Sequence, residues 1–583
     1  MPLTLLNQRV ISWHVKKIAV IGPGIVGMPM AALLAHARIC EGGDQPATVT
    51  VIQRNSGTSG WKVGTINEGR SPIGGIEPDL DRVVAESVAA GLLNASHDYE
   101  AARDADVILV CTQTDKKGLE PDYGPLFEAL DGLAAVLKHR PAGNVPMVIF
   151  ESTLAPSTMA TLVRDLFARH GLVEGRDVLL GNSPNRVMPG RLVERVASSD
   201  KIVAGLHPDT PGLIARLYAR IVTQGTLHQT NSMTAEVVKT LENAYRDVRI
   251  AYATEVAQHC DAAGIDFFAL RDQVNTRMND SDAASSNPNA VPSGGLLVPT
   301  VGVGGHCLPK DGILLWWRAL EAQQDTQRSL ILEARRINDA SPAHTIALAE
   351  RAFGALAGRK VALLGAAYRF NSEDTRNSPT LSLARQLIDS GAIVSIHDPY
   401  VYATDQNLKR TGLTPAFSRD IAAVLADAEV AFLCTGHRVY IDDRETMLAM
   451  ASKLVGVVDA CNLWRAEDLA ARGIGYTGIG RGTAAPDAAL VDLVSEGFRA
   501  VETGVANEVS GLVDFLNQRY ATDGFNQVRF SEVQRIAGTC VTGCRIVDAA
   551  LVKTPMAGRS PATLVSRMAA VAAVGAGAGA VKA

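Results

Sequence analysis

The sequence predicts an α/β protein with two doubly wound parallel-sheet domains joined by a long central helix and followed by a C-terminal extension. Two series of short apolar runs, each alternating with helix-like segments, indicate the two sheets. One amphipathic stretch between them, residues 234–264, indicates the helix. A chain of 583 residues is also too long for a single hydrophobic core, so several domains are expected.

The first series begins with an expected strand at Lys17–Ile21, which a glycine turn and an Ala- and Leu-rich segment follow directly. Further apolar runs lie at 49–52, 106–111, 146–150 and 177–181. Strands separated in this way by helical segments are typical of a parallel sheet with helices on both faces.

Gly22, Gly24 and Gly27 form the pattern G-x-G-x-x-G between the first strand and its helix. The first glycine permits a tight turn, the second lets a pyrophosphate approach the backbone, and the third allows close packing of helix on strand. The flanking strand and helix favour a dinucleotide site over a structural turn. We therefore predict that residues 1–225 form an NAD(P)-binding Rossmann domain.

The residues that should select the cofactor are unusual. The end of the second strand normally carries an Asp or Glu that accepts from the ribose 2′-hydroxyl, but here the sequence has Gln53 and Arg54. Gln53 can still bond the hydroxyl, whereas Arg54 could neutralise a 2′-phosphate. NAD is the expected cofactor, and NADP is the alternative.

The central stretch has Thr234 as a suitable N-cap and Gly264 as its stop. Lys239, Asn243 and Arg246 are spaced i, i+4 and i+7, so they share one face of the helix. By spacing alone this stripe could simply be a solvated face. Residues 226–345 are predicted to form a central helical domain.

The segment VGVGGHCLPKDG, residues 301–312, places one cysteine in a run of glycines. The residues alone leave four interpretations of Cys307 open: inert packing, a metal ligand, half of a disulfide, or a nucleophile. The glycines would let a substrate approach, and the charge of Lys310 would favour a thiolate. A nucleophilic cysteine beside a nicotinamide suggests aldehyde oxidation through a thiohemiacetal and a thioester.

A second strand-and-helix series, with apolar runs at 360–368, 392–398, 429–436 and 455–460, predicts another α/β domain at residues 346–484. Beyond it the composition changes. For residues 485–583 we expect one amphipathic helix over 490–520, a short mixed segment and an Ala/Gly-rich tail that is disordered from about residue 559.

Composition narrows the class of protein further. A net charge of −5 offers no basic surface for nucleic acid. The start of the chain is unlike a signal peptide and no apolar run reaches about 18 residues, so we expect a cytoplasmic protein without membrane contact. The eight cysteines are scattered and are expected to be thiols, and no metal site is expected.

Seven motifs occur in order between about residues 16 and 483: GPGIVGMP, INEGRSPI with EPDL, FESTLAPSTM, SPNRVMPGR, VVKTLENAYRDVRIAYATE, GVGGHCLPKD and LLGAAYRFNSEDTRNSP. With them the chain resembles the UDP-glucose and GDP-mannose dehydrogenase family, especially the branch that acts on UDP-N-acetylhexosamines. The resemblance implies oxidation of a sugar C6 alcohol to a carboxylate, with two hydrides passed to NAD. It also implies a homodimer built on the central helix, a nucleotide-sugar (UDP) binding role for residues 346–484, and Cys307 as the nucleophile.

The resemblance implies roles for individual residues. Lys239 and Asn243 match the cation and amide that stabilise the developing oxyanion. Asp311 matches an aspartate that holds a water and helps in proton transfer, and Thr153 matches the threonine beside that water. The catalytic set implied is Cys307, Lys239, Asn243, Asp311, Thr153 and Asn185.

Cofactor and substrate residues follow from the glycine motif and the resemblance together. The cofactor-binding set is Gly22, Gly24, Gly27, Gln53, Arg54, Thr112, Lys310 and Arg376. The substrate-binding set is Tyr368, Arg369, Arg249 and Gly304. Arg369 stands where the family usually has lysine, so a cation is retained.

Asn185 departs from the family pattern, which has a glutamate there that activates the hydrolytic water. An amide cannot accept a proton at neutral pH. Two alternatives therefore stand beside a complete dehydrogenase: a variant that stops at the aldehyde or acyl-enzyme, and a non-catalytic nucleotide-sugar binder. The extension beyond Thr483 is outside the resemblance and has no functional interpretation from sequence.

Overall fold

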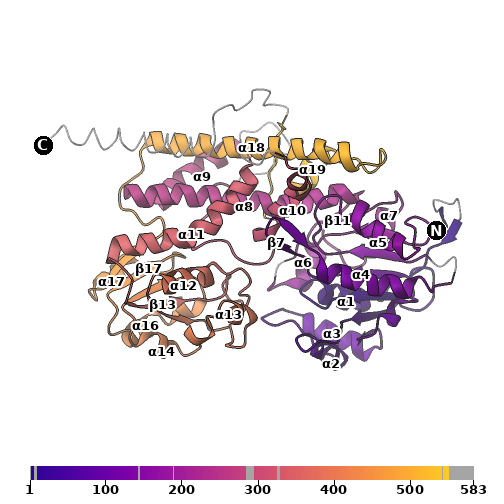
Figure 1. The fold of residues 1–583 in the computed structure, drawn as a ribbon, viewed down its shortest axis with the longest axis horizontal. Coiled ribbons are helices and arrows are strands. Elements are labelled where there is room, and N and C mark those ends of the chain that lie inside the picture. The colour runs from indigo at the N-terminus through magenta and orange to yellow at the C-terminus, as the bar shows by residue number, and fades with distance from the viewer. Residues whose placement is uncertain are drawn as a thin grey trace. The chain divides into compact units, whose positions relative to one another are not determined.

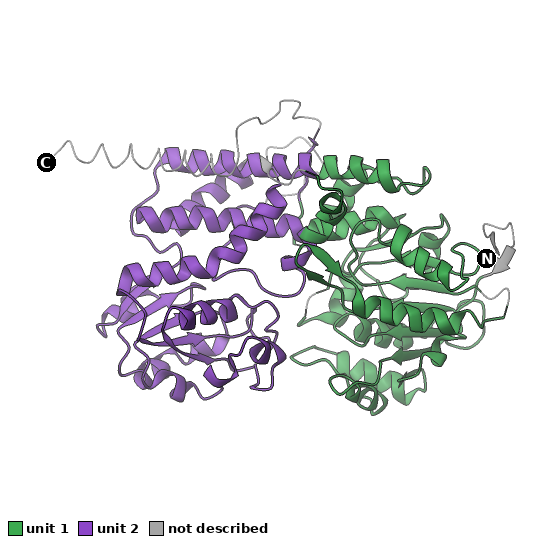
Figure 2. Ribbon diagram, viewed as in Figure 1, with its two compact units in different colours: residues 1–242, 313–324, 509–544 green, residues 243–312, 325–508, 545–583 purple. Residues whose placement is uncertain are grey.

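The computed structural model describes residues 2–4, 10–141, 145–187, 189–283, 294–324, 329–540 and 542–549 (Figure 1). The expected disordered tail, from about residue 559, lies outside these residues. The chain divides into two compact units (Figure 2). Unit 1 comprises residues 1–242, 313–324 and 509–544, and unit 2 comprises residues 243–312, 325–508 and 545–583.

Unit 1 is built on an eight-stranded sheet in the order β12-β11-β10-β9-β6-β3-β4-β5. Neighbouring strands are parallel except β10 and β11, which are antiparallel. The strands are β3 (Lys17–Ile21), β4 (Thr48–Ile52), β5 (Leu93–Ser96), β6 (Val107–Val110), β9 (Met147–Phe150), β10 (Leu179–Asn182), β11 (Lys201–Gly205) and β12 (Leu227–Asn231). Every residue of β6 and β9 is buried, because helices cover both faces of the sheet.

Two hydrophobic cores lie on the two faces of this sheet. The first includes side chains of α1 (Gly27–His36), α2 (Trp61–Asn67), α3 (Leu80–Ala89), α6 (Leu192–Ser198) and α7 (Thr210–Tyr218). The second includes side chains of α4 (Gly124–Leu137) and α5 (Arg164–Arg169). Two short hairpins pair β1 (Pro2–Thr4) with β2 (Val10–Ser12), and β7 (Asp115–Lys117) with β8 (Glu120–Asp122).

Unit 2 contains a six-stranded sheet, all parallel, in the order β15-β14-β13-β16-β17-β18. Its strands are β13 (Lys360–Leu364), β14 (Ile393–His397), β15 (Phe417–Ser418), β16 (Val430–Leu433), β17 (Gly456–Asp459) and β18 (Gly475–Gly478). Its helices are α12 (Pro379–Asp389), α13 (Gln406–Arg410), α14 (Ile421–Leu425), α15 (Arg438–Asp442), α16 (Arg444–Met450) and α17 (Ala466–Ala470). The prediction of two doubly wound sheets is confirmed.

The segment between the sheets is helical: α8 (Ser232–Ala263), α9 (Phe267–Ala283), α10 (Leu308–Glu321) and α11 (Leu330–Phe353). The expectation that Thr234 caps α8 is wrong, because the Asn231 side chain accepts from the Thr234 amide (2.8 Å) and caps the helix three residues earlier. Gly264, with φ +69°, ends α8 as predicted.

The C-terminal extension forms α18 (Ala488–Tyr520) and α19 (Phe530–Ala537). Within unit 2, α18 lies alongside α8 (Figure 1): Tyr252 donates to the Val494 carbonyl (2.7 Å) and Tyr245 to Glu502 (3.1 Å). The described part of the chain has no helix with the length and apolar character that crossing a membrane requires.

Candidate active site

The glycine turn after β3 has the geometry of a pyrophosphate cradle. Gly22 has φ +92°, which only glycine adopts readily, and a Cβ on Gly27 would lie 2.1 Å from the Gly22 carbonyl oxygen. A Cβ on Gly24 would meet nothing within 4 Å, so this position is open to a ligand. The structure thus gives a steric reason for glycine at positions 22 and 27 and leaves position 24 open.

A lysine that the sequence analysis missed lies at the same turn. Lys62, in α2, donates from Nζ to the carbonyl oxygen of Pro23 (3.2 Å), and burial lowers the pKa of its ammonium. Its 39-residue separation from the turn gives no local sequence signal. An ammonium at this turn favours an anionic ligand such as a pyrophosphate.

The other cofactor residues surround the neighbouring strand ends. Gln53 follows β4 and donates to Ser59 Oγ (2.9 Å), while Arg54 pairs with the exposed Glu128 (2.8 Å). Thr112 follows the end of β6, and its buried Oγ1 has no hydrogen-bond partner within the described ranges. An open cradle and an unpartnered hydroxyl at adjacent strand ends fit a bound dinucleotide.

Glu151 is a second residue that sequence reasoning missed, although it lies in the FESTLAPSTM motif. It follows β9, its side chain is fully buried, and it accepts from Lys201 Nζ (2.7 Å) and the Tyr218 hydroxyl (2.5 Å). Burial raises the pKa of Tyr218 well above its usual value, so the phenol keeps its proton and donates. A buried carboxylate held in this way positions what it touches.

Asn185 is one of the groups that Glu151 holds. Its amide nitrogen donates to Glu151 Oε2 (3.2 Å), and its amide oxygen accepts from the Val187 backbone (3.0 Å). The orientation of the amide is thereby fixed. Thr153, two residues after Glu151, is tied to the loop between β6 and β7 because its carbonyl accepts from the Thr114 hydroxyl (2.8 Å).

The polar stripe on α8 is not a solvated face. Lys239 is only 8% exposed, and Asn243, one turn further along the same face, is half-buried. Asn243 donates to Asp311 Oδ2 (2.5 Å), which shows that the stripe meets another predicted catalytic residue.

The cysteine segment surrounds Asp311. Cys307 is exposed and directly precedes α10, and its carbonyl accepts from the amides of Lys310 and Asp311. The buried Lys310 ammonium pairs with Asp311 Oδ1 (2.5 Å). The charge of Lys310 is therefore directed at Asp311, and the sequence-based picture of a free ammonium acting on the thiol needs this correction.

Tyr368 packs directly against the glycines before Cys307. A Cβ on Gly304 would lie 2.5 Å from Tyr368 Cβ, and one on Gly305, which has φ +89°, would lie 2.9 Å from the ring carbon Cζ. Burial raises the pKa of Tyr368 to about 12. Close packing of ring on backbone is thus the reason for glycine at both positions.

Three arginines of the predicted site have partners of their own. Arg376 pairs with Asp374 (2.5 Å), and its carbonyl accepts from the Gly305 amide (2.8 Å). The guanidinium of Arg369 lies over the Phe370 ring, 5.6 Å from its centroid. Arg249 is buried, donates to the Gly295 carbonyl (2.5 Å) and lies over the Phe498 ring of the extension.

The predicted residues therefore fall into two sets, one in each unit. Unit 1 holds Gly22, Gly24, Gly27, Gln53, Arg54, Thr112, Thr153, Asn185 and Lys239. Unit 2 holds Asn243, Arg249, Gly304, Cys307, Lys310, Asp311, Tyr368, Arg369 and Arg376. The cofactor cradle belongs to the first set and the predicted nucleophile to the second.

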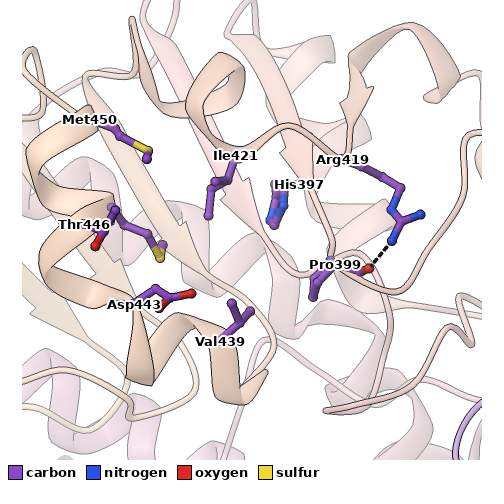
Figure 3. Close-up of a pocket in the computed structure, with 9 residues that line it drawn as sticks. His397, Pro399, Arg419, Ile421, Val439, Asp443, Thr446 and Met450 are labelled. Atoms are coloured by element: carbon purple, nitrogen blue, oxygen red, sulfur yellow. Dashed lines mark hydrogen bonds between the residues drawn. The ribbon is translucent and has the colours of Figure 1, made fainter.

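A pocket of about 430 Å³ lies elsewhere in unit 2, at the end of β14 (Figure 3). Arg419 lies at this pocket and donates to the Pro399 carbonyl (2.7 Å). Its lining is His397, Pro399, Arg419, Ile421, Val439, Asp443, Thr446, Met447 and Met450. None of these is a predicted site residue, so the pocket is not the site deduced from the sequence.

Comparisons with known proteins bear on this site. Three domain models of the UDP-glucose/GDP-mannose dehydrogenase family match the chain: the NAD binding domain at residues 16–222, the central domain at 233–340 and the UDP binding domain at 362–466. The UDP-N-acetyl-D-mannosamine dehydrogenase of Pyrococcus horikoshii is 30% identical over 470 residues, which cover 80% of this chain and 99% of that protein.

Two solved structures share the fold. The UDP-D-ManNAc dehydrogenase from Pyrococcus horikoshii has a TM-score of 0.66 at 29% identity, covering 80% of this chain and 100% of that one. The NDP-N-acetyl-D-galactosaminuronic acid dehydrogenase from Methanosarcina mazei Go1 has a TM-score of 0.65 at 30% identity, covering 80% of this chain and 96% of that one. The resemblance stated from the seven motifs is confirmed.

Proposed function

Because this chain belongs to the UDP-glucose/GDP-mannose dehydrogenase family and is an NAD-dependent enzyme of that type, we propose that it oxidises C6 of a UDP-N-acetylhexosamine to the carboxylate. The proposal is carried by the cysteine segment, where Cys307 stands exposed and Asp311 is held between Lys310 and Asn243. The sugar class is taken from the relatives, which are named for N-acetylated hexosamine substrates or products.

NAD, when bound, supplies the acceptor for the two hydrides that leave C6. The glycine cradle and Lys62 would hold its pyrophosphate. The amide oxygen of Gln53 is an acceptor and would take the hydrogen bond from the ribose 2′-hydroxyl. Arg54 is already paired with Glu128, which supports NAD over NADP because a 2′-phosphate would have to displace that carboxylate.

Cys307 is the proposed nucleophile. Its sulfur adds to the C6 aldehyde carbon while the thiol proton passes to the carbonyl oxygen, which gives a thiohemiacetal; loss of a hydride from that carbon and of the hydroxyl proton to water leaves a thioester. Lys239 and the second N–H of Asn243 are the proposed donors to the oxyanion, and Asp311 orients Asn243 by accepting its first N–H.

Hydrolysis of the thioester is the proposed slow step. Water must add to the acyl carbon and lose a proton before the carbon–sulfur bond breaks and the thiol returns. Asn185 can orient this water together with Thr153 but cannot take its proton. Asp311 is the carboxylate of the predicted set that remains for this task.

The proposal is tested by the yield of reduced cofactor per sugar across a panel of nucleotide-sugars. A complete dehydrogenase gives two equivalents, a variant that stops at the aldehyde gives one, and a binder gives none. Wild-type enzyme should give two equivalents of reduced cofactor per UDP-N-acetylhexosamine. The time course should show a burst of reduced cofactor followed by slow turnover. Intact mass spectrometry of a quenched sample should then find a sugar acyl adduct on Cys307.

Cys307→Ser should abolish acid formation and the adduct, because a hydroxyl is a far weaker nucleophile than a thiolate. Binding of the nucleotide-sugar, measured by calorimetry, should change by less than about threefold, since the serine keeps the shape of the loop. Acid production at an undiminished rate would make Cys307 a structural residue and remove the mechanism.

The homodimer implied by the resemblance needs a surface, and α8 offers little of one here. No residue of α8 before Ala262 is exposed, and α18 of the same chain covers Tyr245 and Tyr252. We therefore propose that any dimer forms through a surface other than α8. Variants that carry a charged residue on α8, where this helix lies beside α18, would test this. Their oligomeric state, measured by light scattering, should be the same as that of the wild type.

A further inference from the structure

The loop that follows β10 carries Asn185 and, next to it, a buried arginine. The Arg186 side chain is 4% exposed and donates to the Glu242 carboxylate (2.5 Å) and to the Asp200 carbonyl (3.2 Å). Two further acceptors come from the C-terminal extension: Thr539 Oγ1 (2.9 Å) and the Ile536 carbonyl (3.0 Å). One guanidinium is thus fixed by four groups, half of them more than 340 residues away in sequence.

The extension is anchored to unit 1 at a second place. Asn231, the cap of α8, donates its side-chain amide to the carbonyls of Phe525 (2.9 Å) and Gln527 (2.8 Å). Val533 and Ile536 of α19 are fully buried. Residues 525–539 are therefore a packed part of unit 1, although the family matches end at residue 466 and 80% of this chain already spans 99% of the Pyrococcus relative.

We infer that residues 525–539 hold the Asn185 loop in place through Arg186, so that Arg186 and Thr539 are positioning residues for the thioester hydrolysis of the proposed function. The role in thioester hydrolysis rests on the proposed function. The claim that the extension supports the loop depends only on the hydrogen bonds to Arg186.

The physical reason is the fixed geometry of a guanidinium. Its donors lie in one plane, so acceptors on both amino groups set the direction of the whole side chain and of the backbone that bears it. Asn185, the next residue back, is held by Glu151 and Val187. Two successive residues of the loop are thus tied down, and a water held by Asn185 gains a fixed position, which matters because small misplacements slow a reaction strongly.

The test uses the full-length chain with Thr539→Val, which keeps the side-chain shape but removes one of the two acceptors for Arg186 Nη1. Arg186→Lys is the second variant, since an ammonium cannot reach all four acceptors. Thr542→Val is the matched control: Thr542 lies in the same extension, three residues beyond Thr539, and its hydroxyl contacts Cys540 Sγ, not Arg186.

Hydrogen exchange of the peptide that covers residues 181–187 should be roughly tenfold faster in Thr539→Val and Arg186→Lys than in wild type or the control. Steady-state kcat, which reports thioester hydrolysis, should fall roughly threefold to tenfold in the two variants. The burst of reduced cofactor and the KM for nucleotide-sugar should stay within about twofold of wild type.

Unchanged exchange in both variants would overturn the inference, whatever their activity. Equal slowing of the burst and of steady-state turnover would also overturn it, because it would show general destabilisation and no positioning. If wild-type enzyme forms no reduced cofactor with any nucleotide-sugar, the proposed function fails instead, and faster exchange in the two variants alone would still support the loop contact.

Discussion

The two sheets of this protein share the strand order of the Rossmann fold but end their first strands differently. In unit 1, β3 leads into the turn at Gly22, where Gly24 is open and the Lys62 ammonium reaches the Pro23 carbonyl. In unit 2, β13 leads into the turn at Gly365, where the amides of Ala366 and Ala367 both donate to the Asp398 carboxylate (2.8 and 2.9 Å).

Asp398 itself follows β14, the position where a dinucleotide-binding domain has its ribose acid. Here it accepts from backbone amides and from His437 Nε2 (3.0 Å), whose Nδ1 accepts from the Asn371 amide. A carboxylate inside the turn takes the place of an external anion, whereas a cation beside the turn attracts one. The same order of the first strands is therefore followed by a turn that is open to an anion in unit 1 and by a closed turn in unit 2.

The largest effect expected from this contrast concerns Gly24. Gly24→Val should raise the KM for NAD by about 100-fold, which corresponds to about 2.7 kcal/mol, because the new side chain occupies the space of the pyrophosphate. Stability should not change, since nothing lies within 4 Å of the added Cβ. Gly43→Val, which is equally open, is the control, and equal KM values in both variants would contradict the cradle.

Asp398→Asn should destabilise unit 2 by about 2 kcal/mol, because it removes the charge that several buried donors share. Thermal unfolding should show the loss as a fall in Tm, whereas Gln53→Ala, at the matching strand end of unit 1, should cost less than about 1 kcal/mol. A similar Tm for the two variants would mean that the two strand ends are equivalent after all.

Asp398 also makes the stability of unit 2 depend on pH. Burial alone would raise the pKa of Asp398, but hydrogen bonds from His437 and backbone amides hold it below its usual value. A depressed carboxyl pKa contributes stability above the unfolded pKa of about 3.9 and loses it as pH falls through the folded value. Wild type should therefore lose stability below about pH 4 more steeply than Asp398→Asn.

Lys62→Met should raise the KM for NAD about tenfold, with kcat within about twofold, because one cation at the pyrophosphate is lost while the glycines remain. Steady-state kinetics at low and moderate salt would measure the KM for NAD of the variant and of the wild type. The Pro23 contact would be merely structural if the variant bound NAD normally but melted at a lower temperature.

The smallest effect is expected from Asn185→Glu. The new carboxyl would meet Glu151, and like charges at this distance keep one of the two protonated, so it would be a poor base at pH 7. Turnover should change by less than about threefold at pH 7 and increase at higher pH. A large gain at neutral pH, seen in the pH profile of kcat, would show that the loop rearranges to separate the carboxylates.

Much of the fold could be predicted because both faces of each sheet are covered. Strands such as β6 and β9 are then continuous apolar runs, and the turn at Gly22 has steric demands that only glycine meets. The extent of α8 was also predictable from its periodicity, but its cap was not, because Asn231 and Thr234 both suit the role.

The site was predictable only where a residue type is itself the signal, as for Cys307. The pairing of Lys310 with Asp311 was not, because sequence neighbours on a helix do not face each other by default. Glu151, Lys62 and Asp398 were missed for a related reason. Their roles arise from groups that the fold brings from distant segments, and no local pattern marks them.

The attachment of Arg186 to the C-terminal extension affects the order in which the nascent chain folds. Ile536 leaves the ribosome 350 residues after Arg186, which at about 5–20 residues per second takes about 20–70 s. Until then the sheet of unit 1 can form, but the guanidinium has only Glu242 and the Asp200 carbonyl to bind. Completion of the loop therefore comes well after synthesis of the sheet, and a chain cut before residue 525 would leave Arg186 with two of its four acceptors.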